Sequence, residues 1–281
     1  MTEETTPDIH NQPVTEPINA MPELTFNDLP YHWKEAMARA GWSDLMPVQA
    51  KAVPYLMAGR DLMVQARTGS GKTGAFILPL LERINPLNNN TQAVIIGPTR
   101  ELAIQVAKEA ELLVGEKGIR VLSVYGGVSY QKQLDGLKKG AHIVIGTPGR
   151  ILDHLQRGTM SLKNLQILTF DEADRLLDMG FYPDMRQLQS YLPDRKVDTF
   201  MFSATFPANV MRLAEQFMHE PDFLSLSSDN VLALDTEHAY YMVPALDKDR
   251  ALIRIIEVEN PASAFIFCNT KQRVNYVTTI L

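Results

Sequence analysis

One stretch constrains the fold of this chain more than any other. Four mostly apolar residues, Leu62–Gln65, are followed by a turn that contains Gly69 and Gly71, then by Lys72, Thr73 and a second apolar run. This order is typical of a buried strand, a phosphate-binding loop and a helix whose N-terminus faces the anion. The glycines let backbone N–H groups approach a phosphate without a Cβ in the way. The stretch therefore predicts a phosphate-binding loop.

The loop departs at one position from the generic phosphate-binding pattern, because Ala66 stands where the first glycine is usual. An ordinary glycine-rich turn remains an alternative at this point. In the phosphate-binding interpretation, Lys72 supplies positive charge to the outer phosphates and the Thr73 hydroxyl can ligate Mg2+.

After this loop the chain repeats a pattern of short apolar strand, polar or glycine-rich cluster, and helix. The strands are expected at Gln92–Ile96, Arg120–Val124, His142–Ile145, Gln166–Phe170 and Asp198–Phe202. This alternation predicts an α/β domain with a central, mainly parallel sheet flanked by helices. The carboxyl ends of parallel strands lie along one edge, where open α/β sheets bind ligands. We therefore expect the clusters to converge on one cleft.

The organisation of the 281 residues follows from shifts in composition. Residues 1–22 are rich in Thr, Pro and Glu, and they predict a disordered acidic tail. The α/β domain is expected over 23–224, and a linker over 225–237. A second, incomplete domain is expected over 238–281. Its expected elements are a strand at Ala239–Val243, a helix at Asp247–Val258 and a strand at Ala264–Cys268.

Composition limits the function classes. No run approaches the ~20 apolar residues of a membrane span, and the N-terminus lacks the pattern of a secretory signal. Cys268 is the single cysteine, so an intrachain disulfide is impossible. These features predict a cytoplasmic protein without a membrane partner. The net charge of −6 argues mildly against nonspecific coating of nucleic acid, but it allows a local groove for a few phosphates.

An acidic cluster follows the strand expected at Gln166–Phe170. Asp171 would face Thr73 across the sheet edge and could hold Mg2+ through water. Glu172 is suited to orient or deprotonate an attacking water. A surface acidic turn is the alternative interpretation.

Two Pro/Thr segments suggest helix starts at the same edge. Thr147 and Pro148 fit an N-cap and a first-turn proline, and the segment that ends in Arg100 is similar. Arg100 and Arg150 could then bind a phosphodiester backbone. Helix capping alone is the alternative.

Other candidates are weaker when taken singly. The Gln49 amide could read a base edge by donating and accepting together, and Phe26 and Trp42 could stack on adenine. Taken alone, both aromatics are more often core residues. Ser203 and Thr205 offer hydroxyls beside the acidic cluster.

Together these residues closely resemble the DEAD-box family of ATP-dependent RNA helicases. The family name is spelled by Asp171-Glu172-Ala173-Asp174. The other matches, in chain order, are Ala66-Arg67-Thr68-Gly69-Ser70-Gly71-Lys72-Thr73, Pro98-Thr99-Arg100-Glu101-Leu102-Ala103, Gly126-Gly127, Thr147-Pro148-Gly149-Arg150 and Ser203-Ala204-Thr205. Alanine at position 66 is normal in this family. The resemblance covers Phe26 to the end of the sequence.

The resemblance implies a RecA-like P-loop domain that binds ATP and Mg2+ at one edge and single-stranded RNA beside them, with little sequence preference. The implied catalytic residues are Lys72, Asp171 and Glu172, and the implied metal contacts are Thr73 and Asp171. Asp174, Ser203 and Thr205 would link hydrolysis to RNA handling. The implied nucleotide contacts are Phe26, Gln49, Ala66, Arg67, Thr68, Gly69, Ser70, Gly71, Lys72 and Thr73. The implied RNA contacts are Pro98, Thr99, Arg100, Gly126, Gly127, Thr147, Pro148, Gly149 and Arg150.

The sequence also departs from the family pattern. Trp42 replaces the usual Phe, and Leu45-Met46 replaces the usual Pro-Thr, before the retained Gln49. The segment 265–270 resembles the first motif of a second RecA-like domain, and the later motifs, including an arginine-rich one, are not in the sequence. We therefore expect a monomeric ATP-dependent RNA helicase that remodels or unwinds short RNA duplexes. Because the later motifs are missing, we expect the chain as given to bind ATP weakly and to hydrolyse it slowly. A non-enzymatic RNA- or nucleotide-binding module and a DNA helicase are the rival interpretations.

Overall fold

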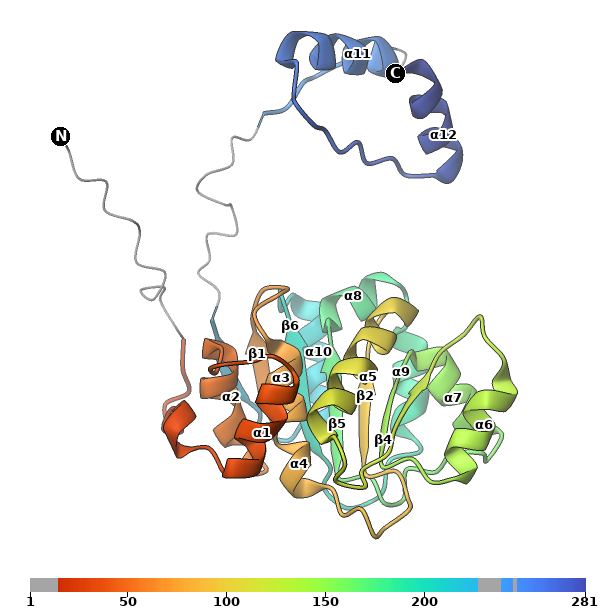
Figure 1. Cartoon of the computed structure of the whole chain (residues 1–281). Helices are drawn as coiled ribbons and strands as arrows, with labels where there is room; N and C mark the ends of the chain where they lie inside the picture. The colour runs from red at the N-terminus through yellow and green to blue at the C-terminus, as the bar shows by residue number, and fades with distance from the viewer. Residues whose placement is uncertain (1–14, 227–238, 245–246) are drawn as a thin grey trace, which may run out of the picture. The chain divides into compact units, whose positions relative to one another are not determined.

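The computed structural model describes residues 15–226, 239–244 and 247–281. The chain divides into two compact units, one up to Val231 and one from Leu232. The units are described separately, and Figure 1 labels most of the elements of both.

The first unit is built on a seven-stranded sheet with the order β3-β4-β2-β5-β6-β1-β7. All neighbouring strands pair in parallel, with Val64 opposite Phe202 and Ile95 opposite Thr169. The α/β class with a parallel sheet is thus confirmed. The strands are β1 Leu62–Gln65, β2 Ala93–Ile96, β3 Val121–Val124, β4 Ile143–Gly146, β5 Ile167–Asp171, β6 Asp198–Ser203 and β7 Asp222–Ser225.

The two faces of the sheet bury separate apolar cores, because successive side chains of a strand point to opposite faces. On β1, for example, Val64 belongs to one core and Met63 to the other. The first core is covered by α1 Tyr31–Arg39, α2 Pro47–Met57, α3 Lys72–Ile77, α4 Leu80–Arg83 and α5 Arg100–Val114.

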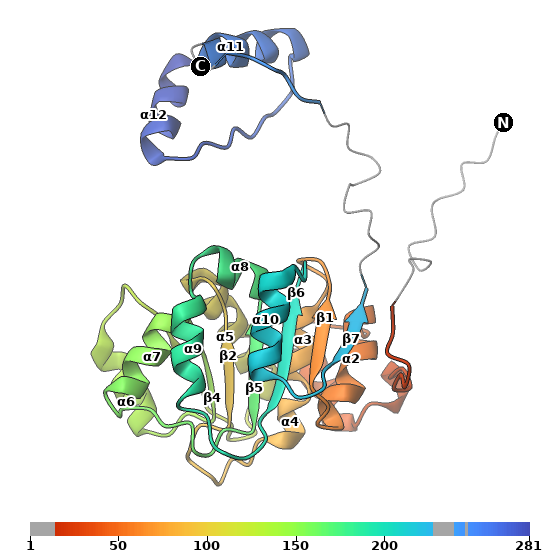
Figure 2. The same ribbon diagram turned by 180° about the vertical axis from the view of Figure 1, so that it is seen from behind.

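The second core lies under the helices on the other face of the sheet, which the reverse view in Figure 2 shows. These are α7 Pro148–Gln156, α8 Ala173–Asp178, α9 Tyr182–Gln189 and α10 Ala208–Phe217. A short 3-10 helix, η1 Phe26–Asp28, precedes α1, and α6 Tyr130–Lys138 packs beside β3. None of the described helices has the length and apolar character required to cross a bilayer.

One edge of the sheet differs from the sequence prediction. The strand β7 was not predicted, and its last residue, Ser225, had been assigned to a linker. The expected disordered tail also differs over its described part, since Thr15 and Ser225 exchange backbone hydrogen bonds of 3.0 and 2.9 Å. The Met21 N–H donates to the Tyr55 hydroxyl at 3.0 Å. Pairing with Thr15 satisfies polar groups that an edge strand leaves open. Residues 1–14 lie outside the described residues.

The second unit contains α11 Lys248–Glu259, which confirms the expected helix, and α12 Lys271–Ile280. The strands expected at Ala239–Val243 and Ala264–Cys268 were wrong, because the described residues there form no strand. An isolated parallel strand has no ladder partner to satisfy its backbone. Phe265 and Phe267 are consequently 90% and 93% exposed.

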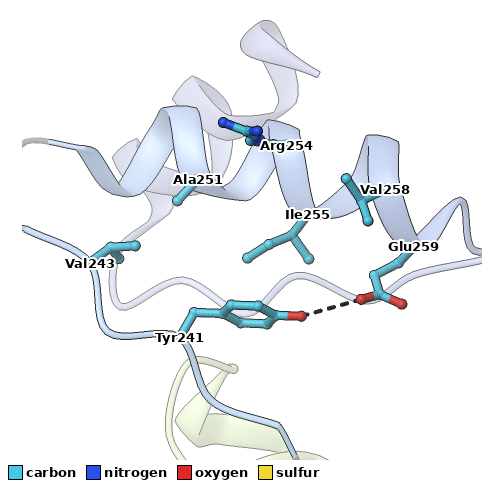
Figure 3. Close-up of a pocket in the computed structure, with 7 residues that line it drawn as sticks. All are labelled: Tyr241, Val243, Ala251, Arg254, Ile255, Val258 and Glu259. Carbon is cyan, nitrogen blue, oxygen red and sulfur yellow. Dashed lines mark hydrogen bonds between the residues drawn. The ribbon is translucent and has the colours of Figure 1, made fainter.

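An apolar pocket lies between the segment that precedes α11 and α11 itself (Figure 3). Tyr241 and Val243 face Ile255 and Val258 across it, and the Tyr241 hydroxyl donates to a Glu259 carboxylate oxygen at 3.2 Å. The pocket has a volume of about 250 Å³. These contacts give the second unit a small apolar cluster in place of a sheet.

The end of β4 tolerates only a glycine. A Cβ on Gly146 would lie 2.1 Å from the carbonyl oxygen of Val124 on the neighbouring strand. We predict that Gly146→Ala lowers the free energy of unfolding by about 1–3 kcal/mol, because β3 and β4 must separate. Urea titration measures the change. Gly126→Ala is the matched control, since a Cβ there meets nothing within 4 Å. Equal stability of the two variants would contradict the prediction.

Candidate functional site

The polar and glycine-rich clusters follow the carboxyl ends of their strands, and the strands are parallel. They therefore lie along one edge of the sheet, as the sequence predicted. In the sheet, β1 is the neighbour of β6, and β6 is the neighbour of β5. The phosphate-binding loop thus emerges beside the clusters that follow β6 and β5, although these lie more than 90 residues later in the sequence.

The loop after β1 is tied to the sheet at its start. The Ala66 N–H donates to the Ser203 carbonyl at 3.0 Å, which continues the pairing of β1 with β6. The loop ends at Gly71, whose φ of 87° is left-handed, and α3 begins at Lys72. The Lys72 ammonium is buried and donates to the carbonyl oxygens of Ala66 and Arg67 at 3.0 and 3.1 Å. A phosphate would compete with these carbonyls for the ammonium.

Two observations support an anionic ligand in this loop. The Ser70 hydroxyl oxygen is buried and has no hydrogen-bond partner among the described residues. A buried hydroxyl without a partner is costly, and a phosphate oxygen would accept a hydrogen bond from it. A hollow of about 280 Å³ also opens here, and Thr68, Lys72, Glu172 and Asp174 line it. Residues of the phosphate-binding loop and of the acidic cluster therefore share one hollow.

The acidic pair occupies the end of β5 and the start of α8. Asp171 is 3% exposed, and burial raises its pKa to about 6, against the opposing effect of the Lys72 charge. Glu172 has a left-handed φ of 51°, which is uncommon for a residue with a side chain. Its carboxylate pairs with the Arg175 guanidinium at 3.2 Å. The strained turn directs two adjacent carboxylates to different positions.

Glu109 on α5 is a further carboxylate that sequence reasoning did not identify. Burial raises its pKa, and a hydrogen bond from the Thr73 hydroxyl opposes this effect. The charge of Glu109 also raises the pKa of Asp171. The sequence offered no signal for Glu109. The motif identified from sequence lies at the start of α5, whereas Glu109 lies nine residues after Arg100 on the same helix.

Asp174, Ser203 and Thr205 are joined by hydrogen bonds. One Asp174 carboxylate oxygen accepts from the Thr205 hydroxyl at 2.8 Å and from the Thr205 N–H at 3.0 Å. The Asp174 N–H donates to the Ser203 hydroxyl at 3.1 Å. Burial alone would raise the pKa of Asp174, but the bonds from Thr205 and Ser203 outweigh it and lower the pKa. The end of β6 is thereby coupled to the start of α8.

The expected adenine-reading residues adopt a different arrangement. Gln49 is 2% exposed; its Nε2 donates to the Gly71 carbonyl at 3.0 Å, and its Oε1 accepts from the Met46 N–H at 2.9 Å. Its amide thus holds the phosphate-binding loop, and base reading would require it to exchange partners. Phe26 packs against the first core, with the Lys34 ammonium 5.5 Å from its ring centroid. The ring of Trp42 lies against Gly74.

Metal ligation at this edge would rest on few protein oxygens. No group of three or more His, Cys, Asp or Glu residues that could hold a metal occurs within the described ranges. Mg2+ in phosphate sites commonly takes one or two protein oxygens and completes its shell with phosphate oxygens and water. Thr73 and Asp171 fit that smaller set.

The residues expected at the nucleic-acid edge begin α5 and α7 or form the loop after β3. The Thr99 hydroxyl caps α5 by accepting from the Leu102 N–H at 3.2 Å. Thr147 also occupies an N-cap position, but its hydroxyl makes no capping bond to the described residues of α7. Pro98 and Pro148 are buried, whereas Arg100, Gly126, Gly127 and Gly149 are exposed and Arg150 is half-buried.

The fold and the loop define the class: this is a P-loop protein with an α/β sheet and a paired acidic motif. A sequence profile described as DEAD/DEAH box helicase matches residues 46–213. The chain belongs to the DEAD/DEAH box helicase family.

Known relatives agree with this assignment. The chain is 42% identical over 262 residues to the ATP-dependent RNA helicase DeaD of Haemophilus influenzae, covering 92% of this chain and 43% of the relative. It is 39% identical to the DEAD-box ATP-dependent RNA helicase CshA of Bacillus subtilis, covering 92% and 52%. The chain thus spans about half the length of these curated relatives.

A solved structure supports the fold. The crystal structure of a DEAD box protein from the hyperthermophile Methanococcus jannaschii is similar, with a TM-score of 0.69 and 36% sequence identity. The match covers 92% of this chain and 70% of that chain.

The buried Asp171 carboxyl predicts a pH-dependent stability. The pKa of Asp171 is raised from 3.8 to about 6, so the folded state binds a proton at Asp171 more tightly than the unfolded state does. The stability gained from this proton is complete below about pH 4 and is lost as the pH rises through about 6. Asp171→Asn should therefore be more stable than the native chain at pH 7, by on the order of 1–2 kcal/mol. Thermal melts between pH 4 and 8 measure this, with exposed Asp194→Asn as the control. If Asp171→Asn is still more stable than the native chain at pH 4, the electrostatic explanation is refuted.

The contact between Gly74 and Trp42 predicts a size constraint. A Cβ at position 74 would lie 2.4 Å from Gln49 Nε2 and 2.7 Å from a Trp42 ring carbon. Gly74→Ala should lower the free energy of unfolding by about 1–3 kcal/mol and shift the emission of Trp42. Fluorescence in a Trp33→Phe background isolates that emission. The double variant Gly74→Ala/Trp42→Phe should recover part of the loss, because the smaller ring leaves space. No recovery would show that the ring is not the obstacle.

Proposed function

We propose that this chain is the ATP-binding part of an RNA helicase, which binds ATP with Mg2+ and single-stranded RNA along one sheet edge. The observation that carries the proposal is the shared hollow lined by Lys72 of the phosphate-binding loop and by Glu172 and Asp174 of the acidic motif. A phosphate-binding lysine and two carboxylates around one hollow suit phosphoryl transfer to water.

The nucleotide would occupy the loop after β1. Its phosphates would accept from the backbone N–H groups of the loop, from the Ser70 hydroxyl and from the Lys72 ammonium. Thr73 and Asp171 would hold Mg2+, which supplies charge neutralisation for the phosphates when bound. With the metal present, Asp171 would be ionised, because a nearby dication favours the charged carboxylate.

Hydrolysis would depend on Glu172. Its carboxylate is placed by the left-handed turn and by Arg175, and it lines the hollow. A carboxylate there could orient a water and accept its proton. Release of the phosphate would alter the charge felt by Asp174, whose bonds to Ser203 and Thr205 connect α8 to the end of β6. This connection is our proposed route from hydrolysis to the RNA-binding edge.

RNA would lie across the starts of α5 and α7. The N-terminal ends of these helices carry partial positive charge and exposed backbone groups, and Arg100 and Arg150 add two cations. Contacts of this kind recognise the backbone and carry little sequence information. The chain spans about half the length of its curated relatives, and complete duplex unwinding is proposed for a chain of their full length.

Nucleotide binding provides the direct test. Lys72→Ala should raise the Kd for a fluorescent ADP in Mg2+ by about 10-fold or more, because it removes a charged hydrogen-bond donor. Lys51→Ala is the matched control, because Lys51 lies on α2 and its ammonium is paired with the carboxylates of Glu16 and Glu23. Equal affinities for the native chain and the Lys72 variant would overturn the nucleotide site.

The hydrolytic role has a separate test. Glu172→Gln should bind the fluorescent ADP as the native chain does, yet lower single-turnover ATP hydrolysis by roughly 100-fold or more. Oligouridine should stimulate the native rate and oligodeoxythymidine should not, if 2′-hydroxyl groups are read. ADP binding without any RNA-stimulated hydrolysis would instead support a non-enzymatic nucleotide-binding module.

A further inference from the structure

A buried polar cluster joins α6 and α7, and the proposed function uses only one of its members. Gln133 on α6 is 4% exposed, and His154 on α7 is fully buried. Gln133 contacts both His154 and Arg150, and Arg150 belongs to the proposed RNA-binding edge. Buried polar side chains are costly unless they are hydrogen-bonded, so their partners indicate what they hold in place.

Gln133 makes bonds in three directions. Its Oε1 accepts from Arg150 Nη1 at 3.3 Å and faces His154 Nε2 at 3.2 Å, while its Nε2 donates to the Tyr125 carbonyl at 2.9 Å. An arginine can only donate, so the atom that faces Arg150 must be the carbonyl oxygen. The amide orientation is therefore determined by its neighbours.

His154 completes the arrangement in its neutral form. Because Gln133 Oε1 can only accept, His154 Nε2 carries the proton. The unprotonated Nδ1 faces the Thr159 hydroxyl at 2.8 Å, and that hydroxyl also lies 3.1 Å from the His154 carbonyl oxygen. Burial and the neighbouring Arg150 charge lower the pKa of His154, which keeps the ring neutral. The imidazole thus holds the same Gln133 carbonyl oxygen that Arg150 contacts.

An aromatic ring supports the same arginine. Tyr130 stacks on His154 with ring centroids 4.5 Å apart and an interplanar angle of 17°. The guanidinium carbons of Arg150 and Arg157 lie 5.5 and 5.1 Å from the Tyr130 centroid, within cation–π range. Arg150 is therefore held both by a carbonyl oxygen and by a ring face.

The other end of Gln133 reaches the second arginine. The Tyr125 carbonyl that it binds belongs to the start of the loop containing Gly126 and Gly127. The Tyr125 ring lies under the Arg100 guanidinium, with 5.3 Å between its centroid and the guanidinium carbon. One buried amide thus connects the supports of both Arg100 and Arg150.

We propose that Gln133 is a positioning residue that holds Arg150 and the Tyr125 support of Arg100 in the arrangement that binds successive RNA phosphates, with His154 fixing the orientation of its amide. This inference rests on the proposed function, since it assigns Arg150 to RNA. Arginines held in place before binding lose less side-chain freedom when a phosphate arrives, so preorganisation increases affinity without a new RNA contact.

The test is a double-mutant cycle on RNA affinity, measured by anisotropy with a short fluorescein-labelled oligouridine and the whole chain. Arg150→Ala should weaken binding, and Gln133→Leu, which keeps the volume, should weaken it about 3- to 10-fold. In the Arg150→Ala background the effect of Gln133→Leu should be clearly smaller, because part of its influence passes through that arginine. Affinity for a fluorescent ADP should not change in Gln133→Leu.

His154 provides a second, independent variant. His154→Gln can place an amide N–H near the former Nε2 position and should retain affinity for oligouridine, whereas His154→Leu should reduce it as Gln133→Leu does. This rescue separates positioning from simple loss of packing, because both substitutions fill the site. Melting temperatures of all variants check that folding is intact, and the His154 pair decides the matter if Gln133→Leu does not fold.

The outcomes distinguish the inference from the function on which it rests. If Arg150→Ala weakens RNA binding but Gln133→Leu leaves it unchanged or strengthens it, the positioning role is wrong and the RNA edge stands. Fully additive effects in the cycle would also overturn the positioning role. If Arg150→Ala leaves oligouridine affinity unchanged, both the RNA edge and this inference fall, while the nucleotide site is judged by the Lys72 experiment.

Discussion

Parallel pairing of β1 with β6, and of β6 with β5, is the constraint on which the rest of the structure depends. The backbone ladder continues to the first residue of the phosphate-binding loop, where the Ala66 N–H binds the Ser203 carbonyl. This places the loop, the acidic motif and the Ser203 segment beside one another. Without that pairing the same motifs would lie at unrelated positions, because the order and register of the strands place their carboxyl ends side by side.

Electrostatics at this edge follow from burial. Lys72 and Asp171 are both largely removed from water, and the cost of burying the Asp171 carboxylate exceeds the attraction of Lys72, so its pKa rises to about 6. Asp174, only a short distance along the chain, has its pKa lowered because the Thr205 and Ser203 hydrogen bonds favour its charged form. Two neighbouring carboxyl groups therefore differ in their proton affinity, as is common where carboxylates have distinct roles.

Much of the first unit could be predicted from the sequence. Each of the strands expected after the loop was found within one residue of its expected ends, because short apolar runs bounded by polar clusters define buried parallel strands. The strand β7 was missed, since Asp222–Ser225 is too short and too polar at its ends to show a period. In the second unit, the apolar runs at Ala239–Val243 and Ala264–Cys268 suggested strands, but local pattern cannot supply the partners that a sheet requires.

The sequence by itself determined which residues are predicted to bind phosphate, metal or an RNA backbone, because those predictions rest on side-chain chemistry and motif spacing. Only the tertiary structure decided how those residues are held. It showed the Gln49 amide bound to the Gly71 carbonyl, Glu109 beside Thr73, and Gln133 between Arg150 and Tyr125. Each of these contacts joins different elements of the fold, and a hydrogen bond between elements depends on how they pack, which no local pattern encodes.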